Sequence, residues 1–281
     1  MTDAAAMARL TSFYGRLSPS LEFIQWVLTQ TGVDLDHVQP RDLYERDLDC
    51  HNLGMHAMLD RIADVAAEYG EPGADATVLD LGCGLGGPGR FVADRFGCRI
   101  VGVDLLPLRV ELAQALADMT GMGDRASYRV ADATRLDFGA GSFDQVWMLD
   151  VSMHIRDKAA LFAEIARVLR PDGLLVMHEQ TGPLPKAMRP VTRQAPYIAP
   201  SLPQLLRYVE GAGLRVLTWR DSTQYVLDYF LGLRALLADA PSSDASGDQR
   251  AQGAVVLDAY IETLQRLGGR TGMLIASCRG R

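Results

Sequence analysis

A carboxylate followed at once by closely spaced glycines stands in the stretch VLDLGCGLGG, residues 78–87. Glycines allow a positive φ and let a ligand approach the backbone more closely than a Cβ would permit. A second apolar stretch, RIVGVD over 99–104, ends in another carboxylate, Asp104. A carboxylate at the end of a neighbouring strand is placed to bind both hydroxyls of a ribose. The two stretches together predict a site for a nucleoside-bearing cofactor at the carboxyl edge of a parallel sheet.

The glycine spacing alone does not choose the cofactor. Gly82, Gly84 and Gly87 also satisfy the dinucleotide fingerprint G-x-G-x-x-G, and glycines in a tight strand-to-helix turn need no ligand at all. Asp80 argues against a nicotinamide dinucleotide, because dinucleotide-binding proteins more often carry an apolar residue at its position before the glycines. The sequence also shows no evident second nucleotide half for the nicotinamide.

The elements around these residues must bring both carboxylates to one edge. The middle third of the chain alternates strand and helix with short turns, which is typical of a doubly wound parallel sheet. Strands are predicted at about 76–81, 99–104, 127–131, 143–149 and 173–179, with helices at about 88–96, 107–119 and 156–169. The final third adds strands at 214–218 and 272–278, helices at 201–213, 225–237 and 254–267, and a polar loop over 241–250. The expected fold is α/β: a doubly wound, mostly parallel, seven-stranded Rossmann-like sheet.

Helical segments outside this core form the predicted lid. Residues 1–70, with helices at about 20–30 and 54–69, are an N-terminal helical lid. Residues 71–281 are the core, with lid insertions at about 180–200 and 224–268. All three additions can reach the carboxyl edge of the sheet, where ligands bind in this architecture.

Composition argues against several other functions. The 281-residue chain carries a net charge of −7 and no run of Lys and Arg, which disfavours nucleic acid because phosphate binding needs a basic face. Its four cysteines lack a metal-binding spacing, as expected of buried or incidental thiols in a reducing compartment, and no metal is predicted. The N-terminal residues contain no apolar segment long enough for secretion or a membrane span. A cytoplasmic protein with no membrane partner is expected.

Five motifs follow one another in a fixed order: VLDLGCGLGG at 78–87, VD at 103–104, ADA at 131–133, SFDQVW at 142–147 and RVLRPDG at 167–173. In this order they resemble a class I S-adenosylmethionine-dependent methyltransferase. The resemblance is close over about residues 75–180 and extends in outline to the end of the chain, because a reversed final strand is usual in this family. It implies S-adenosylmethionine as the cofactor.

The resemblance also implies roles at the methionine and ribose ends of that cofactor. Asp80 supports the amino-acid end, directly or through water. Gly82, Gly84 and Gly86 let the chain pass close to the methionine moiety. Asp104 accepts hydrogen bonds from the ribose hydroxyls, which carry no charge, so a carboxylate fits there.

The adenine end is implied to lie against the third strand. Asp132 faces the adenine amino group and Ala133 offers its backbone, while Leu105 and Leu149 also contact the cofactor. For Asp132 the alternative is an ordinary solvated carboxylate at the end of a strand.

Chemistry is expected beside the fourth strand, because in this family that strand ends next to the transferable methyl group. In-line displacement at a sulfonium carbon needs alignment and the exclusion of water, and no metal is demanded. His154 is predicted as a base for acceptors that must lose a proton, since the usual pKa of histidine lies near neutrality; the alternative is that it caps a helix starting around Ile155. Glu179 is predicted to bind a substrate amine or take a proton, or else is solvated at its strand end. Asp150 lines the pocket or serves a turn.

The segment over 47–56 is dense in polar side chains. Together with GLGGPGRF at 84–91, its His-x-x-Gly resembles the branch of glycine/sarcosine-type N-methyltransferases and many natural-product methyltransferases, in which this region closes over the cofactor. A metal bound by His51 and His56 is disfavoured, because a five-residue separation is poor for one helix face.

The predicted function is methyl transfer from S-adenosylmethionine to N, O or C of a small, partly hydrophobic metabolite, in secondary metabolism. Aromatic residues in the lid segments disfavour free glycine as the acceptor, whereas Lys186, Arg189 and Arg193 keep carboxylates and prenyl diphosphates open. The alternatives are a C-methyltransferase of a prenyl-type substrate, a macromolecule methyltransferase, and a non-methylating relative such as a cyclase or binding module. A homodimer is one possible assembly.

Overall fold

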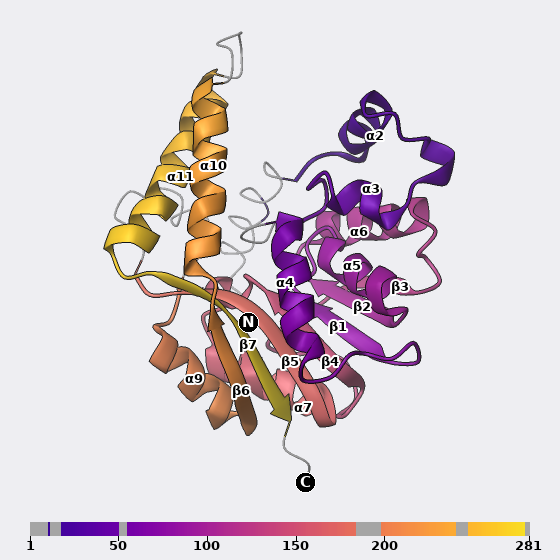
Figure 1. Ribbon diagram of the computed structural model, residues 1–281. Helices are drawn as coiled ribbons and strands as arrows, with labels where there is room; N and C mark the ends of the chain where they lie inside the picture. The colour runs from indigo at the N-terminus through magenta and orange to yellow at the C-terminus, as the bar shows by residue number, and fades with distance from the viewer. Residues whose placement is uncertain (1–10, 12–17, 51–54, 184–197, 240–246, 279–281) are drawn as a thin grey trace.

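The computed structural model describes residue 11 and residues 18–50, 55–183, 198–239 and 247–278. Seven strands form one sheet in the order β3-β2-β1-β4-β5-β7-β6 (Figure 1). They are β1 (Thr77–Leu81), β2 (Arg99–Asp104), β3 (Ala126–Val130), β4 (Phe143–Leu149), β5 (Leu169–Thr181), β6 (Leu214–Asp221) and β7 (Arg270–Cys278). Only β7 runs antiparallel to its neighbours. The prediction of a mostly parallel, seven-stranded Rossmann-like sheet is confirmed.

Helices cover both faces of this sheet. α4 (Met55–Ala67) and α5 (Gly87–Phe96) pack on one face, and α7 (Lys158–Val168) and α9 (Leu202–Gly211) pack on the other. The other helical segments are α2 (Leu21–Gln30), η1 (Leu35–His37), α3 (Pro40–Tyr44), α6 (Pro107–Met119), η2 (Ser152–His154), α10 (Thr223–Asp239) and α11 (Gly247–Arg266). Within the described residues, none of these helices combines the length and the apolar character that a membrane crossing requires.

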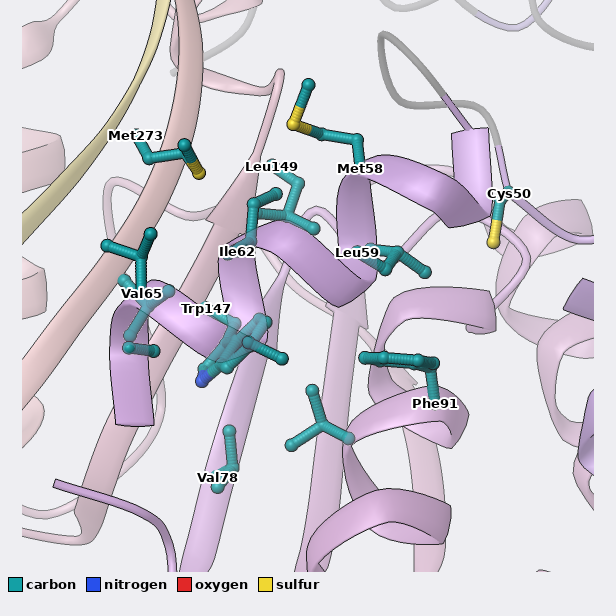
Figure 2. Close-up of a cluster of buried hydrophobic side chains, with 14 of the residues drawn as sticks. Cys50, Met58, Leu59, Ile62, Val65, Val78, Phe91, Trp147, Leu149 and Met273 are labelled. Carbon is teal, nitrogen blue, oxygen red and sulfur yellow. The ribbon is translucent and has the colours of Figure 1, made fainter. Parts of the chain in front are cut away.

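Alternation along β1 divides the core into two layers. Val78 belongs to the apolar cluster beneath α4 and α5, whereas Leu79 belongs to the cluster beneath α7 and α9. Figure 2 shows the first cluster, in which Ile62 of α4 projects toward Trp147 of β4. Because successive side chains of a strand point to opposite faces, Asp80 lies on the Val78 side, beneath α5. A carboxylate is thereby placed inside an otherwise apolar layer.

The glycine stretch ends β1 and starts α5. Gly86 is the N-cap residue of α5 with a φ of 78°, Pro88 follows in the first turn, and Gly97 closes the helix with a φ of 74°. Proline suits the first turn because the missing N–H would have no intrahelical partner there, and glycine takes up the left-handed conformation at the end without steric cost. The strand–turn–helix unit is therefore fixed by local chemistry.

Several boundaries differ from the predictions, among them the starts of β5, α7 and α11. β5 begins at Leu169 because the chain passes through the predicted turn as an irregular strand, with a φ of 63° at Asp172 and a register shift on β4. α7 begins at Lys158, with Asp157 as its N-cap residue. α11 begins at Gly247, inside the predicted polar loop over 241–250, whose first six residues lie outside the described residues.

Helical segments rise from the carboxyl edge at two places. β6 ends and β7 begins at this edge, where Asp221 pairs with Gly272 and Thr181 pairs with Arg270. Because α10 follows β6 and α11 precedes β7, the two helices stand beside β5, in orange and yellow in Figure 1. α2 and α3 pack over α5 and α6 near β1 and β2.

Candidate active site

The glycine loop after β1 passes under a neighbouring turn. Gly82, Gly84 and Gly86 all have positive φ, at 78°, 55° and 78°. A Cβ on Gly82 would lie 2.5 Å from the side chain of Val151, and one on Gly86 would lie 2.6 Å from the ring of Tyr128. Other residues are excluded by the left-handed backbone and by the lack of space. The glycines predicted for the cofactor are thus required by the fold of the loop itself.

Asp80 supports this loop from inside the core. Its carboxylate is buried and accepts a hydrogen bond from the backbone N–H of Gly89 at 3.0 Å. Burial raises the pKa of Asp80 to about 7, and the Gly89 N–H together with the nearby Arg90 opposes part of that rise. Asp80 therefore joins the end of β1 to the first turn of α5.

Asp104 joins the same loop to the second strand. One carboxylate oxygen accepts a hydrogen bond from the N–H of Gly84 at 3.0 Å, and the other accepts one from Leu106 at 2.9 Å. An ionised carboxylate offers about four lone-pair sites, so two contacts leave capacity for further donors such as hydroxyls. The carboxylate predicted to bind ribose is held in a fixed orientation next to the glycine loop.

The residues after β3 lie beside Asp104. The N–H of Ala131 donates to the carbonyl oxygen of Asp104 at 2.9 Å, which brings the following turn to the end of β2. Asp132 accepts hydrogen bonds from the N–H and the hydroxyl of Thr134 at 2.9 and 2.7 Å. Asp132, Ala133 and Leu105 are each partly exposed. The structure thus brings the residues predicted for ribose and adenine together at one edge.

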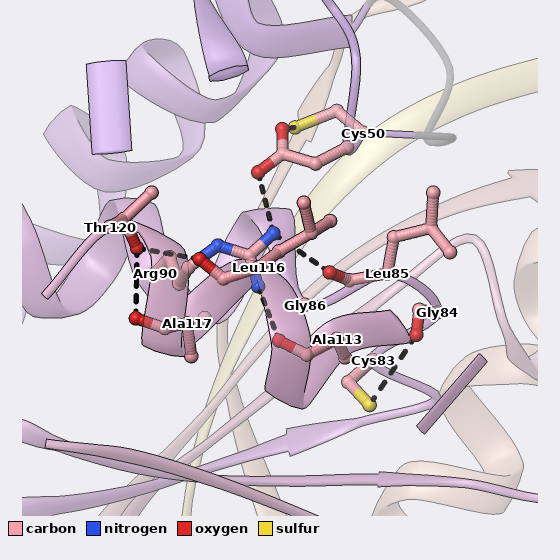
Figure 3. A network of polar contacts seen from close by, with 12 residues as sticks. Cys50, Cys83, Gly84, Leu85, Gly86, Arg90, Ala113, Leu116, Ala117 and Thr120 are labelled. Carbon is pink, nitrogen blue, oxygen red and sulfur yellow. Dashed lines mark hydrogen bonds and ion pairs between the residues drawn. The ribbon is translucent and has the colours of Figure 1, made fainter. Parts of the chain in front are cut away.

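A buried arginine that the sequence analysis overlooked braces the loop from behind (Figure 3). Arg90 of α5 pairs with Asp49 at 2.7 Å, and each side chain is only 1% exposed. The guanidinium also donates to the carbonyl oxygens of Leu85 and Ala113, at 2.7 and 3.1 Å. Tyr128, whose pKa is raised by burial, donates from its hydroxyl to the carbonyl oxygen of Gly86 at 3.2 Å.

This network ties the N-terminal segment to the loop. A Cβ on Gly87 would lie 2.4 Å from the backbone oxygen of Asp49, so the two chain segments are in direct contact. Leu85, at the tip of the loop, packs with Ile24 and Leu28 of α2. The charge of Arg90, placed four residues after Gly86 on an otherwise apolar helix face, was the sequence feature that could have revealed it.

The second half of the edge begins where β4 ends. Leu149 is buried in the layer beneath α4, so its side chain belongs to the core of that layer. The next residue, Asp150, has a φ of 57°, which is uncommon for a residue other than glycine. His154 ends the short η2 turn and is partly exposed. It does not cap α7, because that helix starts at Lys158 with Asp157 as its N-cap residue.

Glu179 lies fully buried on β5 behind this turn. One carboxylate oxygen accepts a hydrogen bond from the N–H of Ser152 at 2.9 Å, and the other has no partner among the described residues. Burial, and then the negative charge of Asp150, raise the pKa of Glu179 to about 8. The alternative of a solvated strand-end carboxylate is wrong, because β5 continues to Thr181 and the side chain is enclosed.

Lys158 lies in the same buried group. Its ammonium donates to the carbonyl oxygens of Ser152, at 2.6 Å, and Ile155. Burial lowers the pKa of Lys158 to about 8, with the nearby Glu179 opposing that shift. The second half of the edge thus holds an acid and a base with shifted pKa values, which is common at functional sites.

A cavity of about 300 Å³ opens at the opposite edge of the sheet. It is lined by residues that precede β1 and by residues at the starts of β4 and β5, among them Ala76, Asp144 and Arg170. None of the predicted site residues borders it.

Comparison with known proteins identifies the segment that carries the glycine loop. Residues 79–177 match the family model described as a methyltransferase domain. The chain carries a methyltransferase domain. The five motifs had predicted this result, and the prediction is confirmed.

Individual relatives agree with this domain assignment. The probable chloroplastic tocopherol O-methyltransferase of Oryza sativa subsp. japonica is 34% identical over 118 residues, which are 41% of this chain and 33% of that protein. The chain spans about a third of the length of the curated relatives it matches. The likeness to them therefore covers a part of each protein and not its whole length.

Solved structures extend the likeness over most of the fold. A putative sarcosine dimethylglycine methyltransferase from Galdieria sulphuraria superposes with a TM-score of 0.70 at 22% identity, covering 80% of this chain and 85% of that one. A geranyl diphosphate methyltransferase in complex with SAM superposes with a TM-score of 0.66 at 26% identity, covering 79% of this chain and 84% of that one. Both place the methyltransferase domain in the same fold.

Proposed function

We propose that the protein transfers a methyl group from S-adenosylmethionine to N, O or C of a small, partly hydrophobic metabolite, in secondary metabolism. The observation that carries this proposal is the junction of the glycine loop with Asp104, in which the carboxylate accepts the Gly84 N–H at the carboxyl edge of the sheet. The methyltransferase domain over 79–177 and the solved relative in complex with SAM support it.

The residues present fit this cofactor. Asp104 can accept hydrogen bonds from uncharged ribose hydroxyls, and the loop leaves space for the methionine end. A Cβ on Gly84 would have Arg109 as its nearest neighbour, at 3.4 Å, so the backbone is open on that side apart from one cation. Asp132, Ala133 and Leu105 follow along the same edge for the adenine, with Leu149 at the end of β4. When bound, the cofactor supplies a methyl group on a positively charged sulfur.

His154 and Glu179 are the proposed catalytic residues. His154 is partly exposed at the end of η2, where it can take a proton from an acceptor that must lose one. Glu179 has a carboxylate oxygen without a partner in the described structure, and its pKa of about 8 suits proton exchange near neutrality. Both lie next to the turn after β4, so they act on the acceptor rather than on the cofactor.

The helices at the carboxyl edge are the proposed lid. α2 and α3 lie over the glycine loop through Leu85, and the α10–α11 pair stands beside β5. Two helical groups flank the edge, which would exclude water from a reaction whose main requirement is alignment. The predicted lid over 180–200 includes residues 184–197, which lie outside the described residues, as do Lys186, Arg189 and Arg193. A cytoplasmic location and a homodimer stay predictions.

Transfer of a labelled methyl group tests the function. The full-length protein is incubated with S-adenosylmethionine labelled at the methyl group and with a panel of phenols, amines, carboxylates and prenyl diphosphates. Release of S-adenosylhomocysteine together with a labelled small product is expected. Cofactor binding in calorimetry without transfer to any member would favour a cyclase or binding module, and transfer to RNA or protein alone would overturn the small-molecule acceptor. Asp104→Ala serves as the control for cofactor-dependent labelling.

A further inference from the structure

Four side chains form a continuous polar chain from the end of β4 to the start of α10. One ring nitrogen of His178, Nδ1, lies 3.0 Å from the carboxylate of Asp150, and the other, Nε2, lies 3.0 Å from the hydroxyl of Ser222. The Ser222 hydroxyl lies 3.0 Å from that of Thr271. His178 and Thr271 are fully buried, and Ser222 is 5% exposed. The chain crosses β4, β5 and β7.

Chemistry assigns a direction to these hydrogen bonds. An ionised carboxylate only accepts, so the Nδ1 of His178 must carry a hydrogen toward Asp150. In the neutral ring Nε2 then accepts, and Ser222 donates to it. The Ser222 oxygen is left to accept from Thr271. All the donors point toward Asp150, and hydrogen bonds arranged in this way strengthen one another in a buried environment.

The same order of Asp, His and Ser activates a nucleophile in hydrolases, but burial excludes that use here. Ser222 is enclosed and its oxygen also faces Thr271, so an acyl group has no access to it. The chain therefore has a role other than covalent catalysis.

At one end, this hydrogen-bonded chain of four side chains is attached to α10 through Ser222. Ser222 directly precedes this helix, and its carbonyl oxygen accepts the first helical hydrogen bond, from Val226 at 3.0 Å. The N–H of Thr223, at the start of α10, donates to the carboxylate of Asp221 at 2.7 Å. The Ser222 hydroxyl is therefore not needed to cap its own helix and points to His178. The N–H of Ser222 donates to the carbonyl oxygen of Thr271 at 2.9 Å.

At the other end, the hydrogen-bonded chain holds the turn after β4 through Asp150. Asp150 is bound to His178 twice, through its side chain and through its backbone N–H, which donates to the His178 carbonyl oxygen at 2.8 Å. A left-handed residue other than glycine persists only where its surroundings hold it, as these contacts do. Asp150 also acts electrostatically on Glu179.

We propose that His178 and Ser222 are positioning residues that hold the Asp150 carboxylate at the methyl-transfer edge and couple it to the first turn of α10. The part of this statement that concerns methyl transfer rests on the proposed function. The coupling itself is a property of the folded protein and is measured without an acceptor.

Nitrogen-15 NMR of the histidine rings tests the direction of the chain. The protein has five histidines, so the His178 signals are identified by their loss in His178→Gln. In the wild type we expect a neutral ring with the hydrogen on Nδ1. Asp150→Ala removes the acceptor, and the preference for Nδ1 should then be lost, whereas Asp150→Asn keeps a side-chain oxygen that can still accept from Nδ1. A hydrogen on Nε2 in place of Nδ1 in the wild type, or an unchanged preference for Nδ1 in Asp150→Ala, would overturn the assignment.

Hydrogen exchange tests the coupling. Ser222→Ala should raise amide exchange in the first turn of α10 by about tenfold, because it removes the tie to His178 while Asp221 still serves the helix N-terminus. Ser222→Thr, which keeps a hydroxyl, should restore most of the protection. Ser277→Ala is the matched control, since it removes a buried hydroxyl from the opposite end of β7 and should leave α10 unchanged.

A double-variant cycle separates coupling from general loosening. In the Asp150→Ala background, Ser222→Ala should add about threefold or less to the exchange of α10, because the hydrogen bond to His178 has already lost its acceptor. Full additivity of the two effects would contradict the proposal. Calorimetry with S-adenosylhomocysteine should give the wild-type affinity within about threefold for Ser222→Ala, since Ser222 lies between β6 and α10, at the far side of the sheet from β1 and β2. Loss of that affinity would show a general structural role, whereas absence of binding in the wild type would count against the proposed function alone.

Discussion

The two halves of the carboxyl edge differ in how completely their polar side chains are bound by the protein. Around β1–β3 the acidic side chains are bound by backbone N–H groups or by Arg90, which leaves a rigid cradle. Around β4 and β5 the edge holds Glu179 with one unpartnered oxygen, as far as the structure describes the chain, and Lys158 with a lowered pKa. A site for the methyl-donating cofactor gains affinity when its binding groups are already held in place. A site for a particular acceptor needs polar groups that are still able to bind that acceptor.

The largest effect is expected from the ion pair that supports the cradle. Arg90→Ala leaves Asp49 charged and buried, which costs about 3–5 kcal/mol of unfolding free energy. Arg95→Ala on the same helix breaks exposed pairs with Asp60 and Asp64 and should cost about 1 kcal/mol or less. Urea unfolding monitored by tryptophan fluorescence measures both.

A third variant keeps this test informative if Arg90→Ala is poorly folded. Asp49→Asn in the Arg90→Ala background removes the unpaired charge and should recover part of the lost stability. Equal costs for Arg90→Ala and Arg95→Ala would mean that the buried pair does not support the loop.

The next effect, on the rate of methyl transfer, is expected from His154 in the acceptor half. His154→Ala should lower the rate of S-adenosylhomocysteine release by about a hundredfold or more if the acceptor must lose a proton. The affinity for S-adenosylmethionine, measured by calorimetry, should stay within about threefold, because the proposed role of His154 is toward the acceptor and not toward the cofactor. A wild-type rate in His154→Ala would leave this residue a structural role in η2.

The converse change falls on the donor side. Asp104→Ala should weaken S-adenosylmethionine binding by about tenfold or more, because hydrogen bonds to a charged group are worth about 1.5–3 kcal/mol. Glu179→Gln is the matched variant from the other half and should bind the cofactor normally. Unchanged affinity in Asp104→Ala by calorimetry would remove its assignment to the ribose.

The two halves also differ in how much of their structure could be predicted from the sequence. The cradle depends on local rules: glycines where φ is positive, Pro88 in the first turn of a helix, and a carboxylate at the end of a strand. The strand–turn–helix units at β1 and β2 could be predicted for that reason, and the cofactor roles of their residues stay predictions. Arg90 was missed because its partner Asp49 lies 41 residues away, and such pairing is not encoded by spacing.

The acceptor half depends on contacts between distant segments. Ser222 meets His178 across 44 residues, and Lys158 lies behind η2 only because of how the chain turns after β4. The predicted start of this helix at residue 156 is two residues early, because Asp157 is the N-cap residue of α7. Burial at Glu179 likewise follows from β5 extending to Thr181, which exceeds the predicted strand.

Glu179, in the acceptor half, should also make the stability of the protein depend on pH. Its folded pKa of about 8 lies above the ordinary value of 4.5, so between these two pH values the folded state holds a proton that the unfolded state has released. The free energy of unfolding should therefore fall as pH rises through this window, by up to about 1.4 kcal/mol per pH unit. Glu179→Gln removes this contribution, and its stability should vary less with pH.

Two other buried groups also make the stability depend on pH, and their contributions can be told apart from that of Glu179. Asp80, with a folded pKa of about 7, adds a slope of the same sign below pH 7 in the wild type and in Glu179→Gln alike. Lys158 acts in the opposite direction above pH 8, because its lowered pKa makes the folded state hold fewer protons there. The difference between wild type and Glu179→Gln should thus be confined to the range below about pH 8. Parallel stability curves for the two proteins would mean that the Glu179 carboxyl is ionised when folded, and the contrast between the two halves would then lose its electrostatic basis.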